Sequence, residues 1–323
     1  MKPLLNVQNL SVTFHTRTGD VHAVEDVSYT LEPGESLAIV GESGSGKSVS
    51  ALSLMGLVPP PGAITNGSLK FNDRDILKMT ESDLQKLRGR EIGMVFQDPM
   101  TSLNPVLTIG RQLTESLIWH EDVRKADAIE RALETLRLVG IPNAEERLLD
   151  YPHQFSGGQR QRIMIAMAII CRPSLLIADE PTTALDVTIQ AQIVDLVKDL
   201  QRKLDMSVIW ITHDLALVAG IVERVAVMYA GSFVEYGSVN GIFKAARHPY
   251  TNGLLQSMPN FEAAVQRRLK SITGAPPDMK QIIAGCPFAP RCPLVVNRCR
   301  EERPILDSSS TDSSVACWQA CLS

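Results

Sequence analysis

The chain has 323 residues, of which 44% are hydrophobic, and its 32 basic and 36 acidic side chains give a net charge of -4. A chain of this length can bury a large core without covalent cross-links, which excludes a small disulfide-stapled domain. The balanced charge gives no general reason for binding a polyanion, so composition does not favour a nucleic-acid-binding protein.

No targeting or membrane-spanning segment is predicted. Residues 1–5 run directly into an alternating segment and lack the hydrophobic stretch and cleavage site of a signal peptide. The longest apolar stretch, residues 163–171, is about half of the roughly 20 residues that a membrane-spanning helix requires. We therefore expect a cytosolic protein. The basic runs at 160–162 and 267–270 are interpreted as solvated helix faces.

The predicted strands fall into two kinds. Residues 4–14 and 22–31 alternate apolar with polar side chains, which predicts an antiparallel layer exposed on one side. Continuous apolar runs suit parallel strands buried on both faces, and helical patterns between them supply the crossovers. These runs lie at 36–41, 92–98, 174–180, 207–214 and 224–231. The predicted fold class is α/β.

Two further regions differ from this pattern. Residues 101–155 carry helical periodicity, as in "DAIERALETLRLVG" closed by Gly140, and indicate a helical insertion. After about residue 258, proline and cysteine become frequent and the strand pattern fades. We predict a main domain over 1–258 and a small cysteine-rich domain over 259–323, with a surface loop at 307–314.

The strongest chemical signal is "GESGSGKS", Gly41 to Ser48, between a predicted strand and a predicted helix. It fits the phosphate-binding pattern G-x-x-x-x-G-K-[ST]. Glycines let backbone amides surround phosphate oxygens, Lys47 supplies a positive charge, and the Ser48 hydroxyl can bind Mg²⁺. A turn with an incidental lysine is the alternative, but the strand, loop and helix context favours a nucleotide site.

An acidic pair and a second glycine motif follow. "LLIADEP" places Asp179 and Glu180 at the end of a predicted strand, where Asp179 can bind the metal and Glu180 can polarise a water. "FSGGQRQR" places Ser156 before a predicted helix, which makes a second anion site. A plain helix cap is the alternative for Ser156. Two anion sites are expected if two chains face each other and complete each other's pockets.

In this combination and order, the motifs resemble those of the nucleotide-binding subunit of an ABC transporter, over about residues 4–258. The resemblance implies a P-loop ABC ATPase fold that binds ATP and Mg²⁺. Its implied catalytic residues are Glu180, His213 and Lys47, and its implied Mg²⁺ ligands are Ser48, Gln97 and Asp179. The implied nucleotide-binding residues are Phe14, Gly41, Ser43, Gly44, Ser45, Gly46, Lys47, Ser48, Val49, Gln97, Ser156, Gly157, Gly158, Gln159 and Asp186.

Individual roles follow from the same resemblance. His213 in "ITHD" is the expected sensor of the γ-phosphate, and Gln97 in "VFQDP" is expected to report nucleotide state to a partner. Phe14 lies at the distance from the phosphate loop that the family uses for an adenine-stacking aromatic, with His15 and Tyr29 as alternatives. Phe155 stands where the family more often has leucine, which we expect to alter packing alone.

Several stretches also resemble one subfamily, the ATPases of dipeptide, oligopeptide and nickel importers, and in particular the longer of their two paired ATPases. These stretches are "QDPMTSLNP", "YPHQFSGGQRQR", "HPYTNGLL" and "GAPPD". The implied function is ATP-driven peptide import. The implied partners are a second homologous ATPase, two transmembrane permeases and an extracytoplasmic solute-binding protein, with the chain peripheral on the cytoplasmic face of the inner membrane. Nickel or glutathione import by the same machinery stays open.

Five of the six cysteines lie in the last 38 residues. In this subfamily, a motif similar to Cys286, Cys292, Cys299 and Cys317 is associated with a [4Fe-4S] cluster. Four thiolates also suit Zn²⁺, although the tight C-x₂-C pairs of common zinc sites are absent. Reduced structural thiols and oxidative pairing are the remaining alternatives. Cys321 is expected to be spare, and Cys171 to be a buried small side chain.

Two other function classes are weighed against the transporter. A soluble ABC ATPase of nucleic-acid repair or translation would normally carry tandem domains or nucleic-acid-binding insertions, and neither is found in this sequence. A metal-sensing regulator would not need the full hydrolytic set. We therefore expect a transport ATPase without a nucleic-acid partner.

Overall fold

The computed structural model of the chain describes residues 2–98, 102–183, 185–258, 271–281, 283–306 and 313–320. The chain divides into two units, each with its own strands, helices and buried apolar side chains. The first unit comprises residues 1–31, 36–77 and 211–323. The second unit comprises residues 32–35 and 78–210.

The N-terminal part of the first unit is an antiparallel sheet with the strand order β2-β1-β4-β5. Its strands are β1 (Leu5–Thr16), β2 (Gly19–Leu31), β4 (Gly62–Phe71) and β5 (Arg74–Asp75). β1 and β2 form a hairpin in which Leu5 pairs with Leu31. From Val27 to Leu31, buried residues of β2 alternate with more exposed ones, as expected for a sheet with one face exposed to solvent. The predicted antiparallel layer is confirmed.

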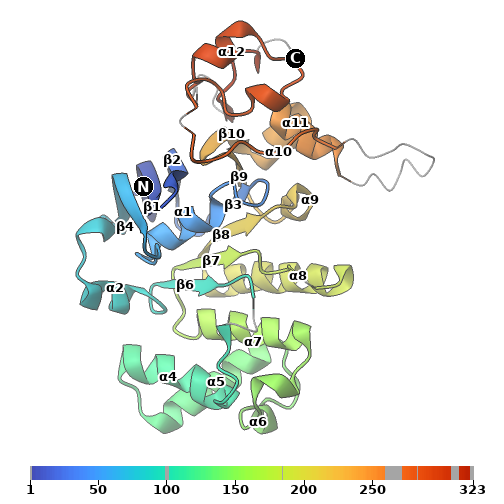
Figure 1. Cartoon of the computed structure of the whole chain (residues 1–323). Helices are drawn as coiled ribbons and strands as arrows, with labels where there is room; N and C mark the ends of the chain where they lie inside the picture. The colour runs from blue at the N-terminus through green and yellow to red at the C-terminus, as the bar shows by residue number, and fades with distance from the viewer. Residues whose placement is uncertain are drawn as a thin grey trace, which may run out of the picture. The chain divides into compact units, whose positions relative to one another are not determined.

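A second group of strands in the first unit has the order β11-β10-β9-β3. β3 (Ser36–Val40) and β9 (Arg224–Tyr229) are parallel, whereas β10 (Ser232–Ser238) is antiparallel to β9 and to β11 (Ser313–Val315). Every residue of β3 is buried, as its continuous apolar sequence predicts. Figure 1 shows helices α10 and α11 and the C-terminal segment gathered around β10.

The helices of the first unit are short. They are α1 (Lys47–Leu54), α9 (Leu215–Val218), α10 (Val239–Ala245), α11 (Pro249–Gln256) and α12 (Asn297–Glu301), with the 3₁₀ turns η1 (Ile76–Lys78) and η3 (Ala289–Arg291). The N-cap residues of α10 and α11 use side chains to accept backbone hydrogen bonds, Ser238 from Gly241 and His248 from Tyr250. These caps fix where each helix begins.

In the second unit, three strands have the order β8-β7-β6. They are β6 (Ile92–Val95), β7 (Leu175–Asp179) and β8 (Ser207–Thr212), and the last residues of β8 belong to the first unit. β6 and β7 are parallel, and every residue of the three strands is buried. Continuous apolar runs therefore form central strands, as predicted.

Helices make up most of the second unit. They are α2 (Glu81–Leu87), α4 (Ile109–Glu121), α5 (Lys125–Leu138), α6 (Ala144–Arg147), α7 (Gly157–Ile169) and α8 (Val187–Leu204), with the turn η2 (Pro152–Gln154). α4, α5 and α6 lie in the region predicted as a helical insertion, and α4 packs against α5 and α7 (Figure 1). Gly140 follows α5 with φ of 77°, a left-handed conformation that suits glycine after a helix.

Two details of the sequence interpretation are wrong. Ser313 and Ser314, predicted as loop, belong to β11, because their backbone pairs with that of β10; residues 307–312 of the predicted loop lie outside the described residues. The run at 160–162 is not a solvated face. The Arg160 Nε donates to the Pro152 carbonyl, and Gln161 is 1% exposed. The basic run at 267–270 lies outside the described residues.

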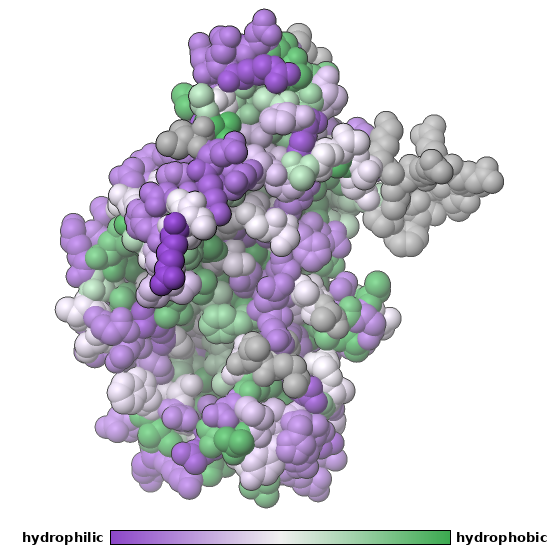
Figure 2. All heavy atoms as spheres, in the orientation of Figure 1, coloured by the Kyte–Doolittle hydropathy of each residue, from purple (hydrophilic) through white to green (hydrophobic). Residues whose placement is uncertain are grey.

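The surface of the described residues carries both hydrophilic and hydrophobic side chains. Hydrophilic and hydrophobic residues are interspersed on the face drawn in Figure 2, and the outermost part around α12 is strongly hydrophilic. Within the described ranges, no helix has both the length and the apolar character needed to cross a bilayer.

Candidate nucleotide and cysteine sites

The phosphate loop, Gly41–Ser48, connects the end of β3 to the start of α1. At two of its glycines, Gly41 and Gly46, neighbouring backbone leaves no room for a side chain. A Cβ at Gly41 would lie 2.1 Å from the Met228 carbonyl oxygen, and one at Gly46 would lie 2.1 Å from the Ala23 carbonyl oxygen. Gly46 also has φ of 102°, a conformation that L side chains rarely adopt. The backbone therefore needs glycine at these positions.

Two polar side chains of the loop are buried. The Lys47 side chain is 4% exposed, and its Nζ donates to the carbonyl oxygens of Gly41 (2.8 Å) and Glu42 (2.9 Å). The Ser45 hydroxyl is buried without a hydrogen-bond partner among the described residues. A buried donor without a partner is costly and often points to a ligand. The loop thus offers a cation, a free hydroxyl and backbone amides, which suits a phosphate chain.

The other predicted residues of this site surround the loop or lie in the same unit. Ser43 and Gly44 are exposed, and Ser48 and Val49 form the half-buried first turn of α1. His213 is exposed directly after β8. These residues are accessible to a ligand.

The aromatic candidates for adenine differ in accessibility. Phe14, on β1, is half-buried, and its ring lies against Gly62 of β4, where an added Cβ would come within 2.7 Å. Tyr29 is 5% exposed, and burial raises the pKa of its hydroxyl. The His15 ring is exposed and lies 2.9 Å from the Asp20 carboxylate. The burial of Tyr29 leaves Phe14 and His15 as the accessible aromatic rings.

The acidic pair lies at the end of β7 in the second unit. Asp179 is 6% exposed, and Glu180 has φ of 46°, a left-handed conformation that is uncommon for a non-glycine residue. The Glu180 Oε2 accepts hydrogen bonds from Gln97 Nε2 (3.2 Å) and Thr183 Oγ1 (2.9 Å). The structure therefore brings together two residues that the sequence motifs identified separately, Gln97 and Glu180, and fixes the carboxylate with two donors.

Ser156 caps α7, so the plain helix cap considered from the sequence is present. Its hydroxyl accepts from the Gln159 amide (3.3 Å), and the Gln159 side chain accepts from the Ser156 amide (3.0 Å). Ser156 and Gly157 are nevertheless exposed, and Gly158 is half-buried. Phe155 is 3% exposed beneath the Arg147 guanidinium. The cap therefore holds the start of α7 rigid while leaving its outer surface accessible.

Asp186 is likewise a helix cap, at the start of α8. Its Oδ1 accepts from the Ile189 amide at 2.9 Å, and the residue is exposed. A cap of this kind satisfies one of the free amides of the first turn. Its position at the surface is compatible with a role toward a second chain.

The cysteine segment, defined as the described residues 283–306 and 313–320, places four thiols around one cavity. Cys286, Cys292, Cys299 and Cys317 line it together with mostly apolar side chains such as Phe288 and Leu294. All five described cysteines are free thiols, and Cys171 is buried as expected. Cys321 lies outside the described residues. No disulfide joins any of the described cysteines.

Burial determines the protonation of three thiols of this cavity. Burial, together with the neighbouring cysteines, raises the pKa of Cys286 to about 11, and burial also raises the pKa values of Cys292 and Cys317. The thiols of Cys286, Cys292 and Cys317 are therefore neutral at pH 7. Among the residues that the structure describes, no group of three or more His, Cys, Asp or Glu side chains is placed to hold a metal ion.

Comparison with known proteins adds independent evidence. A family model for the ABC transporter matches residues 24–183, and one for the oligopeptide/dipeptide transporter C-terminal region matches residues 234–299. The chain is 52% identical over 316 residues to the oligopeptide transport ATP-binding protein OppD of Bacillus subtilis, covering 98% of this chain and 88% of that protein. The chain belongs to the ABC transporter family.

Other members support the same assignment. The chain is 51% identical over 304 residues to the dipeptide transport ATP-binding protein DppD of Escherichia coli, covering 94% of this chain and 93% of that protein. A dimeric ATP-binding cassette, solved in a post-hydrolysis state with ADP and phosphate, matches with a TM-score of 0.65 at 28% identity. That match covers 73% of this chain and 98% of the cassette. The predicted ABC ATPase fold is confirmed.

Each unit carries some of the residues that the sequence motifs predict for nucleotide binding and hydrolysis. The first unit carries Phe14, the phosphate loop, Val49 and His213, and the second carries Gln97, Ser156 to Gln159, Asp179, Glu180 and Asp186. The sequence motifs did not identify two residues that contact Glu42 of the phosphate loop, Tyr250 and Arg291. In the sequence, Arg291 is marked only by its position beside Cys292 in "APRC".

Proposed function

We propose that the chain hydrolyses ATP to power the import of di- or oligopeptides through partner permeases. The observation that carries this proposal is the complete ordered set of ABC motifs on a chain about half-identical to proteins named for oligopeptide and dipeptide transport. A match to the C-terminal region specific to such transporters supports the peptide class. Nickel and glutathione import are the alternatives within the same machinery.

The proposed nucleotide site uses the phosphate loop of the first unit. Backbone amides of the loop and the Ser45 hydroxyl bind phosphate oxygens, and Lys47 turns from its two carbonyl acceptors toward the β and γ phosphates. Phe14 stacks on the adenine. Ser48, Gln97 and Asp179 would hold Mg²⁺, which when bound would neutralise charge on the transferred phosphoryl group.

The proposed catalytic step is phosphoryl transfer to water. The Glu180 carboxylate, held by Gln97 and Thr183, orients the attacking water and accepts its proton. Lys47 and His213 stabilise negative charge on the γ-phosphate. Each group then contributes mainly by position and charge, as phosphoryl transfer requires.

We propose that a second ATPase completes each pocket. The exposed Ser156 and Gly157 at the start of α7 would contact the γ-phosphate bound by the opposite chain, with Gly158, Gln159 and Asp186 beside them. The similar cassette, which was solved as a dimer bound to ADP and phosphate, supports a pairing of two ATPases. The partner is a homologous ATPase or a second copy, and ATP-driven closure of the pair would move the permeases.

The permeases would bind an apolar surface of the second unit. The segment before α4 and the segment after α6 are joined by hydrogen bonds from the Gly110 amide to the Leu148 carbonyl and from the Ile109 amide to the Asp150 carbonyl. Val106 and Leu149, on these segments, are 75% and 76% exposed. Large exposed apolar side chains on adjoining segments are typical of a protein interface. The chain would thus be peripheral on the cytoplasmic face of the inner membrane.

The experiment that tests the function uses proteoliposomes containing the chain, its partner ATPase and both permeases. With the solute-binding protein outside the vesicles and ATP at the ATPase side, we expect labelled dipeptides or oligopeptides to accumulate and to stimulate ATP hydrolysis. If nickel or glutathione stimulates ATP hydrolysis and peptides do not, that compound is the substrate in place of a peptide. Tight association with nucleic acid and no permease complex would contradict transport altogether.

We further propose that Cys286, Cys292, Cys299 and Cys317 hold a [4Fe-4S] cluster. Four cysteine thiols line one mainly apolar cavity, and cysteine thiolates are the usual ligands of such a cluster. The described thiols are not grouped closely enough to hold a metal ion, so the proposal rests on the chemistry of the four donors. When bound, the cluster would cross-link the cysteine segment and keep its thiols ionised.

Replacing Cys292 by Ser is expected to remove iron and acid-labile sulfide from protein purified without oxygen. The matched control is Cys171→Ser, because Cys171 is buried in the other unit and is a free thiol. About four irons and four sulfides per chain in the wild type and the control, but not in Cys292→Ser, would support the cluster. Stoichiometric zinc, or no metal in the wild type, would contradict it.

A further inference from the structure

An ion pair joins the cysteine segment to the phosphate loop. The Arg291 guanidinium makes two parallel hydrogen bonds to the Glu42 carboxylate, Nη1 to Oε2 at 2.8 Å and Nη2 to Oε1 at 3.0 Å. Glu42 is the second residue of the phosphate loop. Bidentate pairs of this kind fix orientation as well as distance. Both residues belong to the first unit.

The Arg291 guanidinium is buried and fully occupied. Its side chain is 5% exposed, against 27% for Glu42. Nε donates to the Thr273 carbonyl (3.0 Å), Nη2 also donates to the Ile272 carbonyl (3.3 Å), and Nη1 lies 3.3 Å from the Tyr229 hydroxyl. The Glu42 carboxylate raises the pKa of Arg291 above its ordinary value. A buried cation with this many fixed acceptors has little freedom, so it holds Glu42 in one place.

Glu42 is held at three points. Its carboxylate is bound by Arg291, its backbone amide donates to the Tyr250 hydroxyl at 3.0 Å, and its carbonyl accepts from the Lys47 Nζ at 2.9 Å. The last contact involves the lysine proposed to bind the β and γ phosphates. A displacement of Glu42 would therefore move the lysine's acceptor and the amides that follow it in the loop.

Arg291 itself is placed by the cysteine segment to which it belongs. It ends the turn η3 and directly precedes Cys292, and the Phe288 ring before it packs on Tyr229 and Tyr250, with ring centroids 5.2 Å and 5.4 Å away. Phe288 and Cys292 both line the cavity of the four thiols. The conformation of the cysteine segment therefore determines where the guanidinium lies.

We propose that Arg291 is a positioning residue for the phosphate loop, and that the cysteine segment sets the ATP affinity of this chain through the Arg291–Glu42 pair. The proposal rests on the proposed nucleotide site. It adds that a segment 249 residues away in sequence shapes that site without touching the nucleotide. A change in the cysteine segment, such as loss of its ligand, would then weaken ATP binding.

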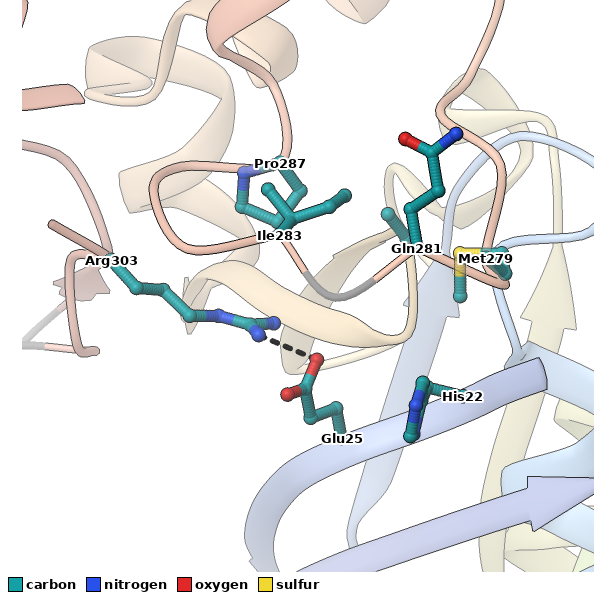
Figure 3. A pocket seen from close by; sticks show the side chains of 8 residues that line it. His22, Glu25, Met279, Gln281, Ile283, Pro287 and Arg303 are labelled. Carbon is teal, nitrogen blue, oxygen red and sulfur yellow. Dashed lines mark ion pairs between the residues drawn. The ribbon is translucent and has the colours of Figure 1, made fainter. Parts of the chain in front are cut away.

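A second ion pair provides a matched control. Arg303 of the cysteine segment pairs with Glu25 of β2 and also donates to the Ser232 hydroxyl at 2.6 Å. Figure 3 shows this pair at the edge of a pocket lined by His22, Met279, Gln281, Ile283 and Pro287. It joins the same segment to the same unit but has neither partner in the phosphate loop. If ATP affinity depended only on how tightly the cysteine segment packs, breaking either ion pair would lower it. If the segment positions the phosphate loop, breaking the Arg291–Glu42 pair alone would lower it.

The test measures the Kd of Mg²⁺-ATP by calorimetry on the full chain, and KM and kcat in the complex with its permeases. The variants are Glu42→Gln, Arg291→Gln, the double variant and Arg291→Lys, with Glu25→Gln and Arg303→Gln as controls. Each single variant of the pair is expected to raise Kd and KM by about 5- to 50-fold, with kcat at saturating ATP within about two-fold. The double variant should be no worse than the singles, because both act through one contact.

Two further results are expected. Arg291→Lys should restore part of the affinity, since it keeps the charge but loses the second hydrogen bond. The control variants should leave Kd and KM within about two-fold of the wild type. If thermal unfolding shows that Arg291→Gln does not fold, the Kd of Glu42→Gln alone tests the proposal, because that substitution nearly preserves the size of the side chain.

Unchanged Kd in a folded Glu42→Gln variant would overturn the proposal, as would equal losses in the control pair or additive losses in the double variant. Failure of the nucleotide site gives a different result. In that case the wild type would bind no Mg²⁺-ATP and would not differ from Lys47→Ala. The two failures are therefore distinguishable in one set of titrations.

Discussion

Replacing Glu180 by Gln is expected to leave Mg²⁺-ATP binding intact while lowering turnover by about 10²- to 10⁴-fold, the range for loss of a general base. The amide keeps the size of the carboxylate and can still accept from Gln97 and Thr183. It cannot take a proton from water. Binding and chemistry should therefore separate in this variant.

The measurement is steady-state ATP hydrolysis by the complete transporter, together with the Kd of ATP for the full chain. The matched control is Asp195→Asn, the same chemical change at an exposed carboxylate on α8. The control should hydrolyse ATP at the wild-type rate. Near-normal turnover in Glu180→Gln would remove Glu180 from the catalytic role.

Replacing Lys47 by Ala is expected to raise the Kd of Mg²⁺-ATP by about 10²-fold or more, because a buried cation that binds phosphate is lost. Lys47 is 4% exposed and makes two hydrogen bonds to the carbonyls of Gly41 and Glu42. The variant also removes these donors, so the loop loses its internal support. We expect a loss of both binding and turnover.

Titration of the full chain with Mg²⁺-ATP checks this prediction. The matched control is Lys244→Ala, which removes an exposed lysine of α10 in the same unit. Its Kd should equal that of the wild type. A Lys47→Ala chain that is folded and binds ATP with wild-type affinity would show that the loop is not the nucleotide site.

Much of the candidate site was predictable because its motifs are local. The loop Gly41–Ser48 needs glycines where the backbone turns left-handed or meets another carbonyl, and these requirements are visible as a fixed spacing in the sequence. The acids follow a continuous apolar strand, and Ser156 precedes a helix. Each signal spans fewer than ten residues, so it does not depend on how distant segments pack.

Contacts between distant segments were not predictable. Gln97 and Glu180 lie 83 positions apart, and Glu42 and Arg291 lie 249 apart, so no spacing rule relates them. The strand β11 was missed for the same reason. Its three residues are a serine pair and a valine without a periodic pattern, and they become a strand only because β10 offers an unpaired edge.

The sequence by itself determined the α/β class, the phosphate loop, the acidic pair and the cysteines of the C-terminal region, because each is written in local spacing and hydrophobic pattern. The tertiary structure alone decided that the four thiols line one cavity, that Tyr29 is buried and unsuited to stacking on adenine, and that Arg291 reaches the loop. Such contacts depend on which surfaces meet when apolar area is buried, and that is a property of the whole chain.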